Sequence, residues 1–179
     1  LGKGCASVLA SEAGYTVYAT GRTTADLEKL AAECAAAGKG KIIPCSLDQK
    51  DDDAVQAFVS KVKAEAGKVD LLVNSAYQGL EAQKPYFAKR FYERPIAEFD
   101  AHMNVGVRSS YVMASLVAPI MVEAKQGLIV QISSTGGAQY LFNTPYGVAH
   151  AAMDRLTADM AAELTELGVQ CVTLWPLSC

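Results

Sequence analysis

The sequence predicts an α/β fold built on a doubly wound parallel sheet with helices on both faces. Short β-branched runs alternate with segments of helical length from one end of the chain to the other. Such alternation places successive strands parallel, because each connection crosses over through a helix. The 179 residues, 51% of them hydrophobic, are enough for a sizeable core, so we expect one domain over residues 1–179.

The first part of the chain is predicted to alternate three helices with three strands. The helices are expected at residues 2–13, 24–37 and 51–66. The strands are expected at residues 15–20, 41–45 and 70–74. Gly38 supplies a stop for the second helix, and Asp48 is expected to cap the third. The third helix is amphipathic, with its valines and one phenylalanine on a single face.

The second part of the chain begins with an aromatic segment, residues 79–95, that is predicted to be irregular. Residues 96–123 carry two helices, or one long helix with a break. A buried strand at 128–132 then leads to a helix at 145–167, which Gly168 ends. The last predicted strand covers residues 169–175.

Composition excludes several classes of function. The formal net charge of −3 is not basic enough to indicate nucleic-acid binding, and no run of 18 apolar residues predicts a spanning helix. The five cysteines lack the spacing of metal ligands, so no metal site is expected. Their odd number and scatter indicate reduced thiols, which predicts an intracellular protein, cytoplasmic or organellar. They are Cys5, Cys34, Cys45, Cys171 and Cys179.

The candidate reactive groups lie in the second part of the chain. Tyr146 and His150 are four residues apart on a predicted helix, so they share one face. The strand at 128–132 ends in Ser133 and Ser134, 13 and 12 residues before Tyr146, and a serine there can aim its hydroxyl at the same carbonyl as the tyrosine. Side chains alternate along a strand, so only one serine should face the site. Ser134 is preferred because Ser133 reads more naturally as strand.

These motifs resemble the short-chain dehydrogenase/reductase family, whose signature is Tyr-x-x-x-Lys after a strand-end serine. The resemblance spans nearly the whole chain and implies a Rossmann-like sheet. Three further segments carry it: residues 1–6 resemble part of the glycine-rich motif, 71–77 the Asn-Asn-Ala-Gly segment, and 102–106 the segment with a catalytic asparagine. The resemblance also implies that the first strand and a C-terminal segment are missing, so the domain is expected to be partial and a targeting signal cannot be judged.

The resemblance implies a role for each candidate catalytic residue. Tyr146 would be the general acid, Ser134 would hold the carbonyl oxygen, and Asn104 would position a water for proton relay. His150 stands where the family has lysine. A histidine is mostly neutral at pH 7, so it supplies little of the field that a lysine ammonium gives. Losing that charge removes about 3 kcal/mol at an effective dielectric of 20.

The resemblance also implies a nicotinamide cofactor. Gly2 and Gly4 would face its phosphates at the start of the first helix, Lys3 would add a positive charge near Arg22, and Asn74 would hold a strand end against the cofactor. Tyr146 and His150 would reach the nicotinamide ribose. Arg22 follows the second strand of the family's sheet, where a guanidinium suits a 2′-phosphate. We therefore predict NADP(H) over NAD(H).

Two functions remain open. The first is an NADP-dependent oxidoreductase that interconverts a carbonyl and an alcohol on a small apolar substrate. An aromatic wall would bind that substrate, made by Tyr77, Tyr140, Phe142 and the loop at 86–92. The alternative is a catalytically impaired member that serves as a cofactor-binding or structural subunit of a larger assembly. It would explain four departures from the family pattern, at Ser46, Ser75, His150 and Leu177.

An oligomer is expected in either case. The helices near 100–123 and 146–167 resemble the faces through which family members dimerise. Small residues there would allow close packing between copies: Ala114, Ala149, Ala152 and Ala161.

Overall fold

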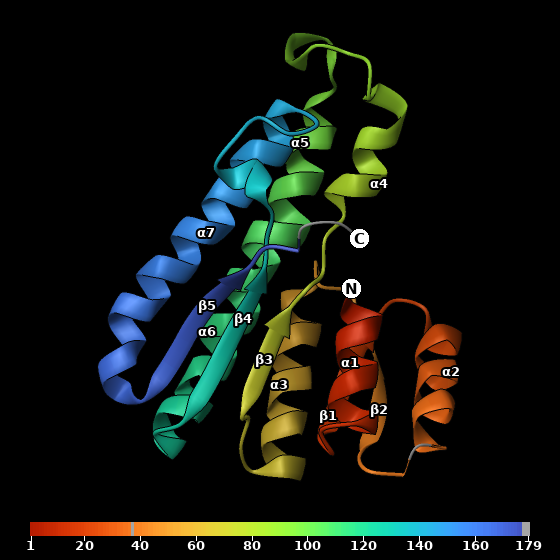
Figure 1. Ribbon diagram of the computed structural model, residues 1–179, viewed down its shortest axis with the longest axis vertical. Helices are drawn as coiled ribbons and strands as arrows, with labels where there is room; N and C mark the ends of the chain where they lie inside the picture. The colour runs from red at the N-terminus through yellow and green to blue at the C-terminus, as the bar shows by residue number, and fades with distance from the viewer. Residues whose placement is uncertain (37, 177–179) are drawn as a thin grey trace. The chain divides into compact units, whose positions relative to one another are not determined.

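The computed structural model describes residues 1–36 and 38–176. The chain forms two compact units, Leu1–Phe58 and Val59–Cys179. Helix α3 (Asp52–Ala66) begins in the first unit and ends in the second (Figure 1). All pairings between the described strands are parallel, which confirms the predicted α/β class.

The first unit pairs two parallel strands, β1 (Thr16–Gly21) and β2 (Lys41–Ser46). Helices α1 (Gly2–Ser11) and α2 (Thr24–Ala35) contact each other and both strands. Gly38 adopts φ +75°, which favours glycine and suits the predicted stop after α2. Small and branched apolar side chains fill the core of this unit: Ala6, Ala10, Ala19, Leu27, Leu30, Cys34 and Ile42.

Asp51, and not Asp48, caps helix α3. The Asp51 carboxylate accepts a hydrogen bond from the backbone N–H of Ala54 at 3.0 Å, which is the contact an N-cap residue makes. Asp48 instead accepts from the N–H of Lys50 at 3.0 Å and so closes a local turn. The prediction for Asp48 was wrong because two acidic residues precede the helix, and a turn separates them.

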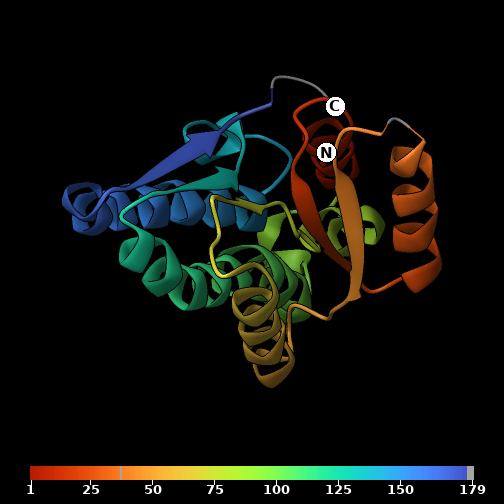
Figure 2. The same cartoon turned by 90° about the horizontal axis from the view of Figure 1, so that it is seen from below.

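The second unit is built on a three-stranded parallel sheet in the order β3-β4-β5. The strands are β3 (Leu71–Asn74), β4 (Gly127–Ile132) and β5 (Val169–Leu174). Helices α6 (Ser109–Ala124) and α7 (Thr144–Leu164) cover the same face of this sheet (Figure 2). Large apolar side chains, among them Met121, Ile129 and Met153, are buried in this unit.

The predicted break in residues 96–123 is present. Helix α5 (Ile96–His102) leads into a π-helical segment, η3 (Met103–Arg108), in which Val105 and Gly106 leave helical geometry. Two serines satisfy the backbone there, since Ser109 Oγ accepts from the Gly106 N–H and Ser110 Oγ donates to the Gly106 carbonyl. The break therefore places Gly106 in a fixed, buried conformation.

The stretch Ile96–Ala124 is long and apolar enough to cross a membrane by length and composition alone. The sequence did not predict a spanning helix. A core helix of a folded domain passes the same test, and residues of α6 such as Met113, Val117 and Ile120 are buried in this unit. This burial accounts for the apolar composition of α6. The break at Val105 also interrupts the helical geometry of the stretch.

Residues 79–95 are more ordered than predicted. They form a short helix α4 (Gly79–Gln83) and two 3₁₀ turns, η1 (Lys84–Tyr86) and η2 (Phe91–Glu93). Arg94 fastens the loop, because its guanidinium donates to the carbonyls of Lys89 and Phe87 at 3.0 and 3.3 Å. These pieces are too short to show a helical period in the sequence.

Helix α7 ends in a 3₁₀ turn, η5 (Thr165–Leu167), before β5. Gly168 adopts φ +86°, and a Cβ there would overlap the backbone carbonyl of Lys125. The predicted stop at Gly168 is confirmed.

Candidate active site

Tyr146 and His150 stack on each other on one face of α7. Their ring centroids are 3.9 Å apart with an interplanar angle of 29°. Both side chains are buried in the second unit. Asn143 starts the helix that carries them, since its side-chain oxygen accepts from the Tyr146 N–H at 2.8 Å. The four-residue spacing thus brings the two rings together, as the sequence predicts.

His150 is held as a neutral group by its surroundings. Its Nδ1 lies 2.8 Å from the backbone carbonyl of Tyr146, and a carbonyl only accepts, so Nδ1 carries a proton. Burial lowers the pKa of His150 below its ordinary value, although the bond to Tyr146 and the charge of Asp154 offset part of this effect. In the neutral imidazole Nε2 is then an acceptor only. His150 therefore cannot donate to a ribose hydroxyl as a lysine ammonium can.

The two strand-end serines have different partners. Ser133 Oγ donates to the carbonyl of His150 at 3.3 Å and so ties the strand end to α7. Ser134 Oγ accepts from the Gly136 N–H at 3.1 Å at the start of a 3₁₀ turn, η4 (Thr135–Gly137). A Cβ on Gly136 would lie 2.5 Å from Cε1 of Tyr146, so this turn packs directly on the tyrosine ring. The structure therefore brings the Ser134 turn to Tyr146.

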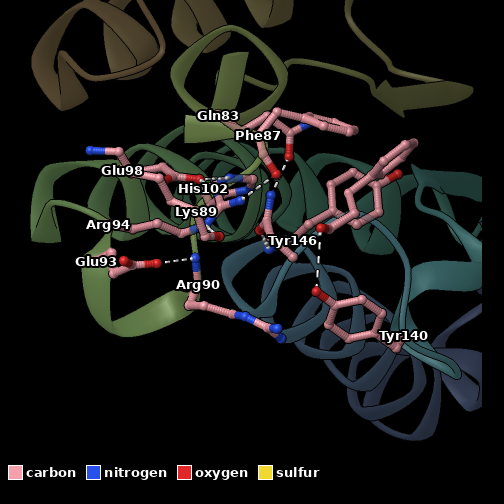
Figure 3. A network of polar contacts seen from close by, with 12 residues as sticks. Gln83, Phe87, Lys89, Arg90, Glu93, Arg94, Glu98, His102, Tyr140 and Tyr146 are labelled. Carbon is pink, nitrogen blue, oxygen red and sulfur yellow. Dashed lines mark hydrogen bonds and ion pairs between the residues drawn. The ribbon is translucent and has the colours of Figure 1, made fainter. Parts of the chain in front are cut away.

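Two phenylalanine rings lead from Tyr146 to the aromatic segment at residues 79–95, in which Phe87 lies (Figure 3). Phe142 meets Tyr146 edge-on, with centroids 4.9 Å apart at 85°, and Phe87 lies 5.9 Å from Phe142. Phe142 adopts φ +62°, a left-handed conformation that costs energy in a bulky residue and is often found at functional sites. The wall predicted from the sequence is thus partly present.

Other members of the predicted wall lie apart from Tyr146. Tyr140 is 81% exposed, and its hydroxyl donates to the Phe142 carbonyl at 3.5 Å. Phe91 and Tyr92 contact each other and are both exposed. These three side chains do not form ring contacts with Tyr146 among the described residues.

Tyr77 and His102 join the site through a contact that the sequence did not indicate. The Tyr77 hydroxyl lies 2.5 Å from Nδ1 of His102, and the Tyr77 ring meets the His150 ring edge-on at 5.0 Å. Burial, and then the proximity of the His150 imidazole and the Arg94 guanidinium, lower the pKa of His102 to about 4. Burial and the proximity of Tyr146 raise the pKa of Tyr77 above its usual range. Both groups are therefore neutral at pH 7.

A buried ion pair lies behind His102 (Figure 3). The Arg94 guanidinium donates to Glu98 Oε1 at 2.5 Å, and the same oxygen lies 3.8 Å from Nε2 of His102. The side chains of Glu98 and His102 are fully buried. Glu98 and His102 lie four residues apart on one face of α5, whereas Arg94 reaches Glu98 from the extended segment before the helix.

Asn143 and Gln83 are further residues that sequence reasoning missed. Asn143 Nδ2 donates to Gln83 Oε1 at 2.5 Å, and both side chains are buried. This bond links the start of α7 to α4. An asparagine followed by a threonine and a proline is a recognisable helix start, so the cap was visible in the sequence, but its partner was not.

The two asparagines predicted for the site differ in position. Asn74 is buried at the end of β3, and its Nδ2 donates to the Ser110 carbonyl at 3.4 Å. Asn104 is exposed on η3. The buried residue at the break is Gly106, and a Cβ there would lie 2.8 Å from the Tyr77 ring. The structure thus does not bring Asn104 into the ring and hydrogen-bond contacts described around Tyr146, and its proposed role remains a prediction.

The cofactor-binding residues predicted near the chain start lie in the first unit. Gly2 and Gly4 are in the first turn of α1, and a Cβ on Gly4 would meet no atom within 4 Å. Gly2 and Gly4 are exposed in this turn, and the exposed Arg22 adds a cation after β1. Lys3 is less available, because its ammonium lies 3.2 Å from the Glu33 carboxylate. These features fit the phosphate end of a dinucleotide.

The remaining departures and packing positions are also placed by the structure. Ser46 is exposed at the end of β2, Ser75 is half-buried after β3, and Leu177 lies outside the described residues.

Ala114 and Ala149 are buried inside the second unit, so they do not offer a face to another copy, contrary to the prediction. Ala152 and Ala161 are half-buried. Within residues 1–36 and 38–176, no three His, Cys, Asp or Glu side chains gather as a metal site.

Comparison with known proteins gives a family model match over almost the whole chain. The model described as short chain dehydrogenase matches residues 1–178. The human protein "Dehydrogenase/reductase SDR family member 1" is 44% identical over 177 residues. Those residues are 98% of this chain and 56% of the human protein, so the chain spans about half the length of that curated relative.

Solved structures give the same result. A metagenomic short-chain oxidoreductase in complex with NADP matches 98% of this chain and 76% of its own, with a TM-score of 0.87 and 30% identity. A 7α-hydroxysteroid dehydrogenase complexed with NADH and 7-oxo glycochenodeoxycholic acid matches 98% of this chain and 66% of its own, with a TM-score of 0.84 and 25% identity. From its sequence and its fold, this chain belongs to the short-chain dehydrogenase family.

Proposed function

We propose that this protein uses NADP(H) to interconvert a carbonyl and an alcohol on a small apolar substrate. The observation that carries the proposal is the surroundings of Tyr146. Its ring lies between Phe142, the Ser134–Gly136 turn and His150, in a buried position at the start of α7. A hydroxyl donor beside aromatic rings suits a substrate with a carbonyl on an apolar body.

Each residue of the site has a step that it can perform. Tyr146 donates its hydroxyl proton to the substrate oxygen in the reduction direction, and takes it back in the oxidation. Ser134 holds that oxygen by hydrogen bonding while the charge on it changes. When bound, the nicotinamide supplies or accepts the hydride. Phe142 and Phe87, both partly exposed, offer an apolar surface to the body of the substrate.

The preference for NADP(H) rests on Arg22. A planar guanidinium matches the oxygens of a 2′-phosphate, whereas a carboxylate at this position would repel them. Arg22 is exposed after β1, and no acidic residue follows it until Asp26. The solved relatives include one structure with NADP and one with NADH, so the proposed preference rests on this protein's own residues.

The alternative is a catalytically impaired member that serves as a cofactor-binding or structural subunit of a larger assembly. One observation favours it: the group beside Tyr146 is a buried imidazole bonded to the tyrosine's own carbonyl. Such a group gives Tyr146 no fixed positive charge. A homo-oligomer is compatible with both functions and remains a prediction.

One experiment tests the function and the cofactor together. NADPH and NADH are titrated into the native protein and into Arg22→Ala, with Arg155→Ala as a control that removes another exposed arginine. We expect native protein and control to prefer NADPH, and Arg22→Ala to lose that preference. Equal affinity of the native protein for both cofactors would contradict the preference.

The same preparations are then assayed on a panel of apolar ketones and aldehydes. We expect slow turnover by the native form and none by Tyr146→Phe, which keeps the ring and removes the proton donor. Cofactor binding without any turnover would support the impaired member. The absence of binding and of turnover would overturn both functions that involve a cofactor.

A further inference from the structure

We propose that Tyr77 is a positioning residue for Tyr146 and His150, and that His102 and Glu98 hold it in place. The inference goes beyond the family motif, because the residues concerned lie outside the Ser, Tyr and Lys positions. Its kinetic consequence rests on the proposed oxidoreductase function, whereas its structural part does not.

Tyr77 contacts both members of the stacked pair. Its ring centroid lies 5.0 Å from that of His150 at 69°, and 6.1 Å from that of Tyr146 at 82°. Both are edge-to-face arrangements, in which aromatic rings attract each other. Phe142 meets Tyr146 edge-on as well, at 85°. Tyr77 and Phe142 thus both restrict the ring that carries the reactive hydroxyl.

His102 fixes the far end of Tyr77. The two side chains are joined by the 2.5 Å contact between the Tyr77 hydroxyl and Nδ1 of His102. On its other side, Nε2 of His102 is buried, makes no hydrogen bond within the described residues, and lies 3.8 Å from Glu98 Oε1, which is an ion-pair distance rather than a hydrogen bond. A carboxylate favours a proton on the nitrogen that faces it, so Nε2 carries the proton and Nδ1 accepts from Tyr77. The resulting order is carboxylate, imidazole and hydroxyl.

The Glu98 end of this series is held by Arg94. Arg94 neutralises Glu98 within a buried pair, and the same guanidinium binds the carbonyls of Phe87 and Lys89. Phe87 in turn contacts Phe142. Glu98 is therefore connected to Tyr146 by two routes, one through His102 and Tyr77 and one through Arg94 and the aromatic segment.

Two glycines provide the space that this arrangement needs. A Cβ on Gly79 would overlap the imidazole of His102, and a Cβ on Gly106 would lie 2.8 Å from the ring of Tyr77. Gly79 has no φ in the left-handed region, so its backbone conformation alone does not require glycine. The space that a side chain would fill at each glycine is occupied instead by a ring of the Tyr77–His102 pair.

The consequence for the reaction is preorganisation. A general acid must stay within hydrogen-bond reach of the substrate oxygen, and small displacements reduce the rate. The stacked His150 supplies no fixed charge to orient Tyr146, so packing must do so. The hydrogen bond of Tyr77 keeps its ring edge against the pair and so limits the motion of Tyr146.

Substitutions of Tyr77 and His102 test the proposal. Tyr77→Phe removes the hydroxyl and keeps the ring, and Tyr111→Phe makes the same change at an exposed site on α6. We expect Tyr77→Phe to lower kcat about tenfold, because the ring that restricts Tyr146 loses the hydrogen bond that holds it. The dissociation constant of Tyr77→Phe for NADPH should stay at the native value. Tyr111→Phe should match the native protein in both kcat and the NADPH dissociation constant. His102→Leu should lower kcat similarly, and His102→Asn should retain more activity because the amide oxygen replaces the acceptor at Nδ1.

Nitrogen NMR of ¹⁵N-histidine provides a readout that does not depend on turnover. The His102 signals are assigned by their loss in His102→Asn. In the native protein at pH 7 we expect His102 to be neutral with its proton on Nε2, and Tyr77→Phe to shift the signals of Nδ1 and of His150.

The outcomes separate the two proposals. A native protein that shows the expected spectra but no turnover removes the oxidoreductase function and leaves the positioning of the rings supported. A proton on Nδ1 of His102 would overturn the proposal. Spectra and kcat that are unchanged in Tyr77→Phe would also overturn it, as would equal kcat for His102→Leu and His102→Asn.

Discussion

At the scale of single residues, position 150 decides what Tyr146 can do. A lysine at this position would place an ammonium beside the tyrosine, whereas His150 presents the face of a neutral ring 3.9 Å away. Its Nδ1–H donates to the carbonyl of Tyr146, so the orientation of the imidazole is set by a bond within α7 and not by a ligand. The residue keeps the rings in contact but contributes no charge.

Restoring the charge should raise the rate if the remaining geometry is competent. An ammonium about 5 Å from the developing charge is worth about 3 kcal/mol at an effective dielectric of 20. We therefore expect His150→Lys to increase kcat by up to about two decades. His150→Gln fills similar space without a charge and should give no increase. The comparison is made in single-turnover reduction with saturating NADPH, and equal rates for the two variants would show that charge does not limit the reaction.

At the scale of elements, the start of α7 determines where both rings lie. Asn143 accepts from the Tyr146 N–H and donates to Gln83, so a single side chain sets the first turn of α7 and its distance from α4. Phe142, the residue before it, is held in a left-handed conformation that brings its ring onto Tyr146. The geometry of the site is therefore built at this helix start.

Removing this cap should destabilise the protein and disturb the site together. Asn143→Ala loses the capping bond and leaves Gln83 buried without that partner, so we expect a loss of about 1–3 kcal/mol in the free energy of unfolding. Asn143→Asp keeps the acceptor for the Tyr146 N–H and should lose less. Urea denaturation measures both variants. A loss in Asn143→Asp as large as that in Asn143→Ala would show that the bond to Gln83, and not the cap, carries the effect.

The elements also show what the sequence could and could not predict. Most long helices and strands were located within a few residues, because apolar periodicity and glycine stops are local signals. The order in residues 79–95 was missed because Arg94 creates it through bonds to carbonyls of its own loop. The cap of α3 was misplaced because both Asp48 and Asp51 have the right chemistry, and only the turn between them decides.

At the scale of the molecule, the same distinction applies to the site. The spacing of Tyr146 and His150 predicted their contact, since helix geometry alone fixes it. The contact between Tyr77 and His102 joins residues 25 apart in the sequence and depends on the space left by Gly79 and Gly106. No local pattern encodes such a contact. The exposure of Asn104 likewise follows from the break at Val105 and Gly106, whose direction the sequence does not reveal.

Burial of His102 should make the stability of the whole protein depend on pH. The unfolded chain binds a proton at His102 near the ordinary pKa of 6.5, whereas the folded protein does so only near pH 4. Between these values the unfolded state holds more protons, so the free energy of unfolding falls as the pH falls. The free energy of unfolding falls by about 3 kcal/mol in total for this reason. The fall begins near pH 6.5 and is complete below pH 4.

His102→Asn isolates this contribution, because asparagine fills part of the same space and does not titrate. The free energy of unfolding is measured in urea at pH 7 and at pH 4.5 for both proteins. Titrating groups remote from position 102 contribute equally to both proteins and cancel in the comparison, whereas His150 interacts with His102, so the difference between the two proteins reports His102 together with that coupling. We expect the native protein to lose about 2–3 kcal/mol more than the variant between the two pH values. Equal losses of unfolding free energy in the two proteins would mean that His102 is already protonated in the folded state at pH 4.5. His102 could then not accept a hydrogen bond from Tyr77 as a neutral imidazole at that pH.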